Sequence, residues 1–315
     1  APLLTDATWP FLSFCTDDRN PLDILEKGHI DHCIRKAISC GAPTISTYRA
    51  ATWGAAQAFG LRDRGKVAPG YLADLVLLDD LERCAVRAVI RRGRLVREDR
   101  LGAAKWVAAV GAESIRLRRV AADDFRAPGS GPTAPVIGVI AGSIVTERLA
   151  ATLPYRDGHR LPDPANDVLA VCVFARHGTG HGVGRGFVKG FGLRRGALAS
   201  SVGHDSHNVI VVGSDADDMA LAVNRITELQ GGFVAVRDGA VRAELALPVA
   251  GLMSARPLAE VADRLRRIRT VTKDMGCPLD EAFLQFAFLP LAVVPHLKIT
   301  DRGMVDVDRF ELIAA

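Results

Sequence analysis

Two adjacent carboxylates, Asp17 and Asp18, follow a short apolar run from Phe11 to Cys15. The run has the length and composition of a buried strand, and in a barrel of parallel strands the side chains at the carboxyl ends reach the reaction centre. A carboxylate at such a position can bind a metal ion or move a proton. The same pair could instead cap the next helix or close an Asx turn, so these residues alone leave both interpretations open.

Histidines form a second group of candidates. His204 and His207 flank Asp205 after an apolar strand, a spacing that suits a metal ion, a substrate contact or a hydrogen-bonded turn. His29 and His32 lie three residues apart and could share one helical face, where His29 could belong to a site or be merely structural. The eight histidines form no H-x-H or H-E-x-x-H pattern.

The glycine-rich run from Gly178 to Gly192 has neither the Gly-Lys-Ser/Thr ending of a phosphate-binding loop nor a G-x-G-x-x-G register leading into a helix. It therefore predicts a flexible loop.

The elements that must position these residues fall into two parts. In the first part, the pattern predicts a strand at residues 11–15, a helix through Ile24 to Ile38 and a second helix from Pro43 to about Phe59. A small β module is expected to follow from Leu61 to Val96, with a hairpin turn at Arg92-Gly93. Ala121 to Pro135 is rich in Ala, Pro and Gly and predicts a linker, with a domain boundary near residue 119. Beyond it, an α+β or α/β domain is expected, with strands at 136–141, 168–174, 209–213 and 232–237 and helices at about 215–230 and 257–275.

Composition narrows the class of protein and its partners. The 40 Lys and Arg residues are interspersed with 36 Asp and Glu residues, so no strong field for nucleic acid is expected. Six scattered cysteines indicate reduced thiols in the cytoplasm. The apolar run from Phe283 to Pro295 is too short for a membrane span and predicts core. The first methionine is Met219, which favours a fragment over a chain that has lost only its initiator.

The segment from Gly65 to Asp79 resembles the G-x-[IV]-x-x-G-x-x-A-D-[LIV]-[VI]-x-x-D signature of amidohydrolases, although an unrelated hairpin is the alternative. Three further segments are similar to adenine deaminases in particular: Cys15–Pro21 with Glu26–Asp31, Gly203–Asn208 and Leu247–Ser254. The resemblance covers essentially the whole chain. It implies an α/β protein made of the end of a TIM-like barrel (residues 1–60), part of a small β-sandwich (61–118) and a carboxy-terminal α+β domain (119–315).

The resemblance also implies the chemistry. Adenine would be deaminated to hypoxanthine and ammonia, as in purine salvage, by water activated by a divalent metal pair, manganese or iron. Asp17 matches the aspartate that binds metal and shuttles protons, Asp18 and His29 are further catalytic candidates, and His204 and His207 are further metal candidates. The family's H-x-H pair, bridging acidic residue and other histidines have no counterpart here, so most ligands are expected upstream of Ala1.

The chain alone is accordingly expected to be inactive, with the missing amino-terminal part as its partner, in a homo-oligomer that contacts neither nucleic acid nor membrane. The alternatives are another amidohydrolase, such as a cyclic-amide hydrolase or deacetylase, and a non-catalytic module.

Overall fold

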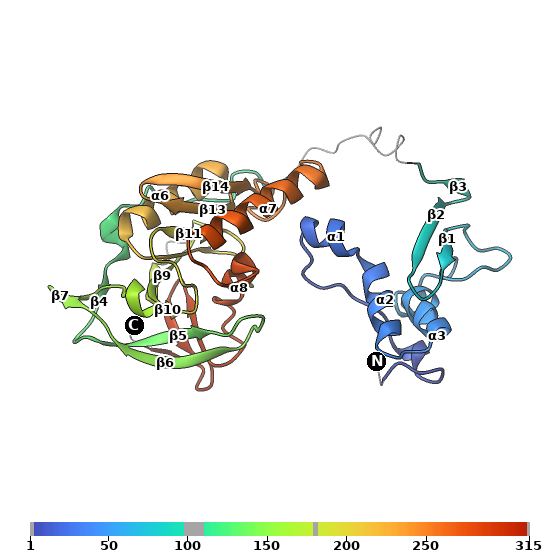
Figure 1. Ribbon diagram of the computed structural model, residues 1–315, viewed down its shortest axis with the longest axis horizontal. Coiled ribbons are helices and arrows are strands. Elements are labelled where there is room, and N and C mark those ends of the chain that lie inside the picture. Colours follow the sequence, from blue (N-terminus) through green and yellow to red (C-terminus); the bar gives the residue numbers. More distant parts are fainter. Residues whose placement is uncertain (1–2, 98–109, 179–181, 314–315) are drawn as a thin grey trace. The chain divides into compact units, whose positions relative to one another are not determined.

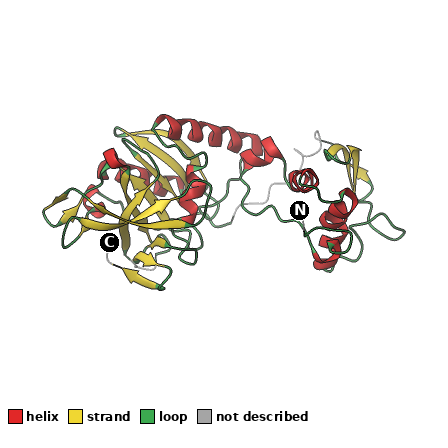
Figure 2. Ribbon diagram, turned by 60° about the horizontal axis from the view of Figure 1, so that its bottom comes forward, coloured by secondary structure: helices red, strands yellow, loops and turns green. Residues whose placement is uncertain are grey.

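The computed structural model describes residues 3–97, 110–178 and 182–313, and the chain divides into two compact units, Ala1–Val107 and Ala108–Ala315. Each unit has its own secondary structure and core and is described by itself (Figures 1 and 2). The fold is mixed α/β, as expected. No helix in the three described ranges is long and apolar enough to cross a membrane.

The first unit combines short helices with a three-stranded antiparallel sheet. Its elements are η1 (Trp9–Phe11), α1 (Pro21–Lys27), α2 (Ile30–Ser39), α3 (Thr44–Arg49), the π-helix η2 (Ala50–Gly54), α4 (Ala55–Ala58), β1 (Leu75–Asp80), β2 (Ala85–Arg91) and β3 (Arg94–Leu95). A small core includes the rings of Trp9 and Trp53, whose centroids are 5.2 Å apart. The expected helix from Pro43 and the expected hairpin turn at Arg92-Gly93 are confirmed.

Two expectations for this unit were wrong. Phe11 ends the helical turn η1, and residues 12–17 have no regular secondary structure. A strand needs a neighbour for its ladder of hydrogen bonds, and no strand of the described residues pairs with this segment. The single helix through Ile24 to Ile38 is two helices, because Gly28 ends α1 with φ 94°.

The second unit is built around an eight-stranded mixed sheet. Its strands follow the order β14-β13-β11-β12-β9-β10-β5-β6, and every neighbouring pair is antiparallel except β5 and β10. These strands are β5 (Thr133–Val139), β6 (Thr146–Thr152), β9 (Val168–Phe174), β10 (Val183–Lys189), β11 (Ala197–Ser200), β12 (Val209–Gly213), β13 (Gly232–Arg237) and β14 (Ala240–Ala246). The predicted strands β9, β12 and β13 are confirmed at their exact bounds.

Helices and two small sheets surround this large sheet. They are η3 (Ala122–Phe125), β4 (Ala127–Pro128), β7 (Tyr155–Arg156), β8 (His159–Arg160), η4 (Pro164–Asn166), α6 (Ala216–Leu229), α7 (Leu258–Asp274), α8 (Ala282–Phe288), β15 (Leu297–Thr300), β16 (Gly303–Asp306) and β17 (Glu311–Ile313). Met219, Val223 and Ile226 of α6 pack into the largest core cluster. All seven residues of β9 are buried, which explains why that strand is continuously apolar.

The glycine-rich run contains a strand, so this part of it is not the flexible loop that was expected. Its residues 183–189 form β10, between β9 and β5, while the expectation for residues 179–181 lies outside the described residues. A Cβ atom on Gly184 would lie 1.8 Å from the Thr300 carbonyl oxygen, and one on Gly186 would lie 2.3 Å from Met304 Sδ. The glycines therefore permit β15 and β16 to approach the strand closely.

The segment from Ala121 to Pro135 is likewise packed rather than a free linker. Phe125 is buried, and its ring contacts Phe174 edge to face at 5.4 Å. Ala127 and Ala134 are also buried, the latter in β5. Its Ala, Pro and Gly content reflects turns and close packing against the sheet.

Lys298 on β15 is a buried cation. Its Nζ atom donates hydrogen bonds to the carbonyl oxygens of Ile144, at 2.7 Å, and Phe288, at 3.0 Å. Burial lowers the pKa of Lys298 to about 8. A neutral amine still has two N–H groups, so both hydrogen bonds survive the loss of the proton.

We expect the free energy of unfolding to contain a component that rises between pH 8 and 10.5, because in that window the unfolded chain holds a proton that folded Lys298 has released. Lys298→Met should remove this component, which is on the order of 3 kcal/mol. Chemical unfolding across this pH range would measure it, with exposed Lys189→Met as the matched control. Equal pH dependence in wild type and Lys298→Met would contradict this assignment.

Candidate functional site

Asp17 and Asp18 lie in the irregular segment between η1 and α1. Both are exposed, and Asp17 has a left-handed backbone with φ 52°. The cap of α1 is Asn20, whose side chain accepts a hydrogen bond of 3.0 Å from the Asp23 amide. The capping alternative for the aspartate pair is therefore wrong, and the Asp17 carboxylate makes no hydrogen bond or ion pair with any described residue.

His29 is brought next to this segment. Its Nε2 atom lies 3.2 Å from Thr16 Oγ1, so the histidine contacts the residue that precedes Asp17. The structure thus places His29 near the predicted catalytic aspartate although 12 positions separate them in the sequence. His32 belongs to α2, and His29 immediately precedes that helix.

The Gly28–Asp31 group is a compact turn that fixes His29. The Asp31 carboxylate accepts a 2.6 Å hydrogen bond from the His29 amide and a 2.7 Å hydrogen bond from Arg35. Burial alone would raise the pKa of Asp31, but these hydrogen bonds outweigh it and lower the pKa. A Cβ atom on Gly28 would lie 2.3 Å from the Asp31 carboxylate, so the glycine makes room for it. The residues Gly28 to Asp31 can therefore be explained by the local structure that they form, a turn that holds His29 in place.

His204 and His207 lie in the loop between β11 and β12. Their ring centroids are 5.7 Å apart, and the ring of His204 also packs against that of Phe288, with centroids 4.9 Å apart and the planes tilted by 32°. The Gly203 amide donates to His207 Nδ1 at 3.3 Å, which requires that nitrogen to be unprotonated. Burial, His204 and Arg176 all lower the pKa of His207. His207 is accordingly neutral at pH 7, with its proton on Nε2.

Arg176, which follows β9, holds this loop in place. Its guanidinium is buried and donates to three backbone carbonyls, those of His207, Ser114 at 3.4 Å and Ala250 at 2.9 Å, and to Ser114 Oγ at 2.9 Å. The Arg176 amide donates to Asn208 Oδ1 at 3.2 Å. One side chain therefore connects the Gly203–Asn208 and Leu247–Ser254 segments. Sequence reasoning missed it, although a charged residue directly after an apolar strand was a usable signal.

A metal centre needs several ligands. Among the described residues, no group of three or more His, Cys, Asp or Glu side chains could hold a metal ion. The exposed Asp17 carboxylate could supply one ligand to a metal ion whose other ligands come from elsewhere. The metal role of His204 and His207 stays a prediction.

Each of the two units of the chain matches a known protein family. Residues 143–311 match the adenine deaminase C-terminal domain, and residues 7–96 match the amidohydrolase family. A protein of Methylobacterium nodulans named adenine deaminase is 59% identical over 314 residues, which are 99% of this chain and 55% of that protein. An adenine deaminase of Gluconobacter oxydans is 59% identical over 97% of this chain, which is 54% of that protein. One of Cereibacter sphaeroides is 53% identical over 99% of this chain, which is 55% of that protein. The chain therefore spans about half the length of these relatives.

We expect Arg176→Leu to lower the free energy of unfolding by about 3 kcal/mol, because buried carbonyl groups lose a charged donor. The pKa of His207 should rise in this variant, since a neighbouring positive charge is removed. Urea unfolding and an NMR titration of His207 would measure the two effects. The matched control is Arg156→Leu, at an exposed residue on β7, and an effect no larger than that of the control would contradict the anchoring role.

Proposed function

Because the chain belongs to the family defined by the adenine deaminase C-terminal domain, we propose that it is the carboxy-terminal part of an enzyme that hydrolyses adenine to hypoxanthine and ammonia. The observation that carries the proposal is the 59% identity to an adenine deaminase over 99% of the chain. This match includes the Asp17 segment and the His204–His207 loop, so it does not depend on one short motif.

Asp17 is the proposed proton shuttle. It accepts a proton from the attacking water and returns it to the amino group that leaves carbon 6 of adenine, so that ammonia departs and hypoxanthine remains. Its exposed carboxylate supports this role, because no hydrogen bond from another described residue competes for it. The nearby imidazole of His29 is the second candidate, as a group that orients water or substrate beside Thr16. Asp18 is the third.

A divalent metal pair, manganese or iron, would lower the pKa of water so that hydroxide is available at neutral pH. Asp17 would supply one ligand to it. His204 and His207 are further candidate ligands, although His207 would first have to give up the hydrogen bond from the Gly203 amide, which keeps the proton of its ring on Nε2.

The proposal includes the architecture of the whole enzyme. Residues 1–60 would complete a TIM-like barrel and the rest of the first unit a small β-sandwich, while the second unit would form the carboxy-terminal domain. The boundary lies earlier than the expected residue 119, because Ile115 already belongs to the core of the second unit. The exposed apolar side chains of the first unit support this, since Phe11, Phe59, Val76 and Val86 are each at least half exposed. The remaining ligands would come from an amino-terminal part like that of the relatives, in a cytoplasmic homo-oligomer.

We expect Asp17→Asn to reduce adenine turnover at least 100-fold in a protein that joins this chain to such an amino-terminal part, because the amide cannot carry the proton. Folding should be unchanged, since asparagine tolerates a left-handed backbone. Rates of ammonia release, with circular dichroism as the folding control, would measure this.

The neighbouring change Asp18→Asn is the matched control and should cost less than tenfold. Near wild-type turnover by Asp17→Asn would refute the shuttle role. Equal losses in both variants would refute the choice of Asp17 over Asp18.

A further inference from the structure

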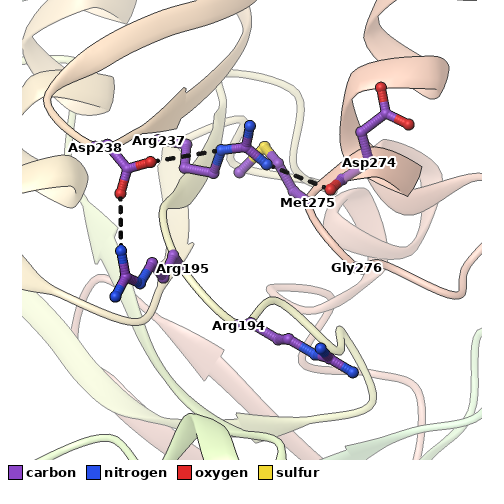
Figure 3. A pocket seen from close by; sticks show the side chains of 7 residues that line it. All are labelled: Arg194, Arg195, Arg237, Asp238, Asp274, Met275 and Gly276. Atoms are coloured by element: carbon purple, nitrogen blue, oxygen red, sulfur yellow. Dashed lines mark hydrogen bonds and ion pairs between the residues drawn. The ribbon is translucent and has the colours of Figure 1, made fainter.

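A cavity of about 300 Å³ lies in the second unit, away from the histidine loop. Three segments surround it: the loop before β11 with Arg194 and Arg195, the end of β13 with Arg237 and Asp238, and the end of α7 (Figure 3). The volume is at the lower end of the range of small-molecule sites. Nothing in the proposed deamination uses it.

Glycines fix the walls of this cavity. Gly276 has φ 101°, and a Cβ atom there would lie 2.9 Å from the Gly192 carbonyl oxygen. Gly196 has φ 98°, and its Cβ would lie 2.3 Å from the Val236 carbonyl oxygen. The segments therefore meet backbone to backbone, so the arginines extend from closely packed supports.

The charges of the lining arginines are poorly balanced. Arg195 and Arg237 share the Asp238 carboxylate at 3.6 and 3.7 Å, distances longer than hydrogen bonds. The Arg237 Nε atom is shielded from solvent and has no hydrogen-bond partner among the described residues. Arg194 has no ion pair within the described part of the chain, and the Asp274 carboxylate points away from the space between the arginines (Figure 3). Arg237 also donates to the Asp274 carbonyl oxygen at 3.3 Å. The positive charges next to the cavity that are incompletely balanced by described groups are therefore those of Arg194 and of Arg195, which shares one carboxylate with Arg237.

We propose that this cavity binds the phosphate group of a small phosphate monoester. Arginines from two segments line it, and a phosphate offers oxygens in several directions, whereas a carboxylate is satisfied by one arginine fork. An adjoining cavity of about 440 Å³ shares Arg194, Arg195 and Asp238, so it gives room for the organic group of the ester. Asp215 and Asp217 line this second space, and their carboxylates favour an organic group with N–H donors.

The test uses adenosine monophosphate as the probe, because it has both a phosphate and an amino group. Calorimetric titration of the 315-residue chain at constant ionic strength should show saturable binding. Adenosine, which lacks the phosphate, should not bind at this cavity. Because binding is measured without turnover, failure here leaves the deaminase proposal untouched.

Arg194→Ser and Arg195→Ser should each weaken adenosine monophosphate binding at least tenfold. Both residues are exposed, so both variants should fold. Arg156→Ser removes an equal charge outside the cavity and should leave the affinity unchanged. The proposal is overturned if the probe does not bind, if adenosine competes equally well, or if the Arg156 variant loses as much affinity as the cavity variants.

Discussion

The buried guanidinium of Arg176 is the interaction on which the candidate loops of the second unit depend. A buried charge is tolerated only when its donors are satisfied, and here backbone carbonyls of three separate segments satisfy them. The side chain therefore fixes the His207 loop and the Ala250 segment relative to β9. Lys298, elsewhere in the second unit, is likewise buried with its ammonium group hydrogen-bonded to two carbonyl oxygens.

The parts of the fold that were predictable are those with strong local patterns. The strand Val168–Phe174 follows from its continuous apolar run, and helix α6 follows from its apolar periodicity. The strand Val183–Lys189 does not, because its glycines have low strand propensity and are required only by the approach of β15 and β16. The strand expected at residues 11–15 fails for the converse reason: its pattern is suitable, but no described strand pairs with it.

The candidate site also has features that were predictable from the sequence and features that were not. Residue type and motif make Asp17, His29 and the histidine loop candidates, because side-chain chemistry is visible in a sequence. Contacts over long sequence distances were not visible: Arg176 reaches Ser114 and Ala250 across 62 and 74 positions. The motif residue Gly28 is explained only by the space that the Asp31 carboxylate occupies.

The central claim is that this chain contributes the proton shuttle and its surroundings, while most metal ligands come from an amino-terminal part. Its most direct test is to join the chain to the amino-terminal part of the Methylobacterium nodulans relative and to measure hypoxanthine formed from adenine with manganese present, beside the 315-residue chain alone. The joined protein should produce hypoxanthine and the chain alone should not. Hypoxanthine formation by the chain alone, or none by a folded joined protein that binds manganese, would contradict the claim.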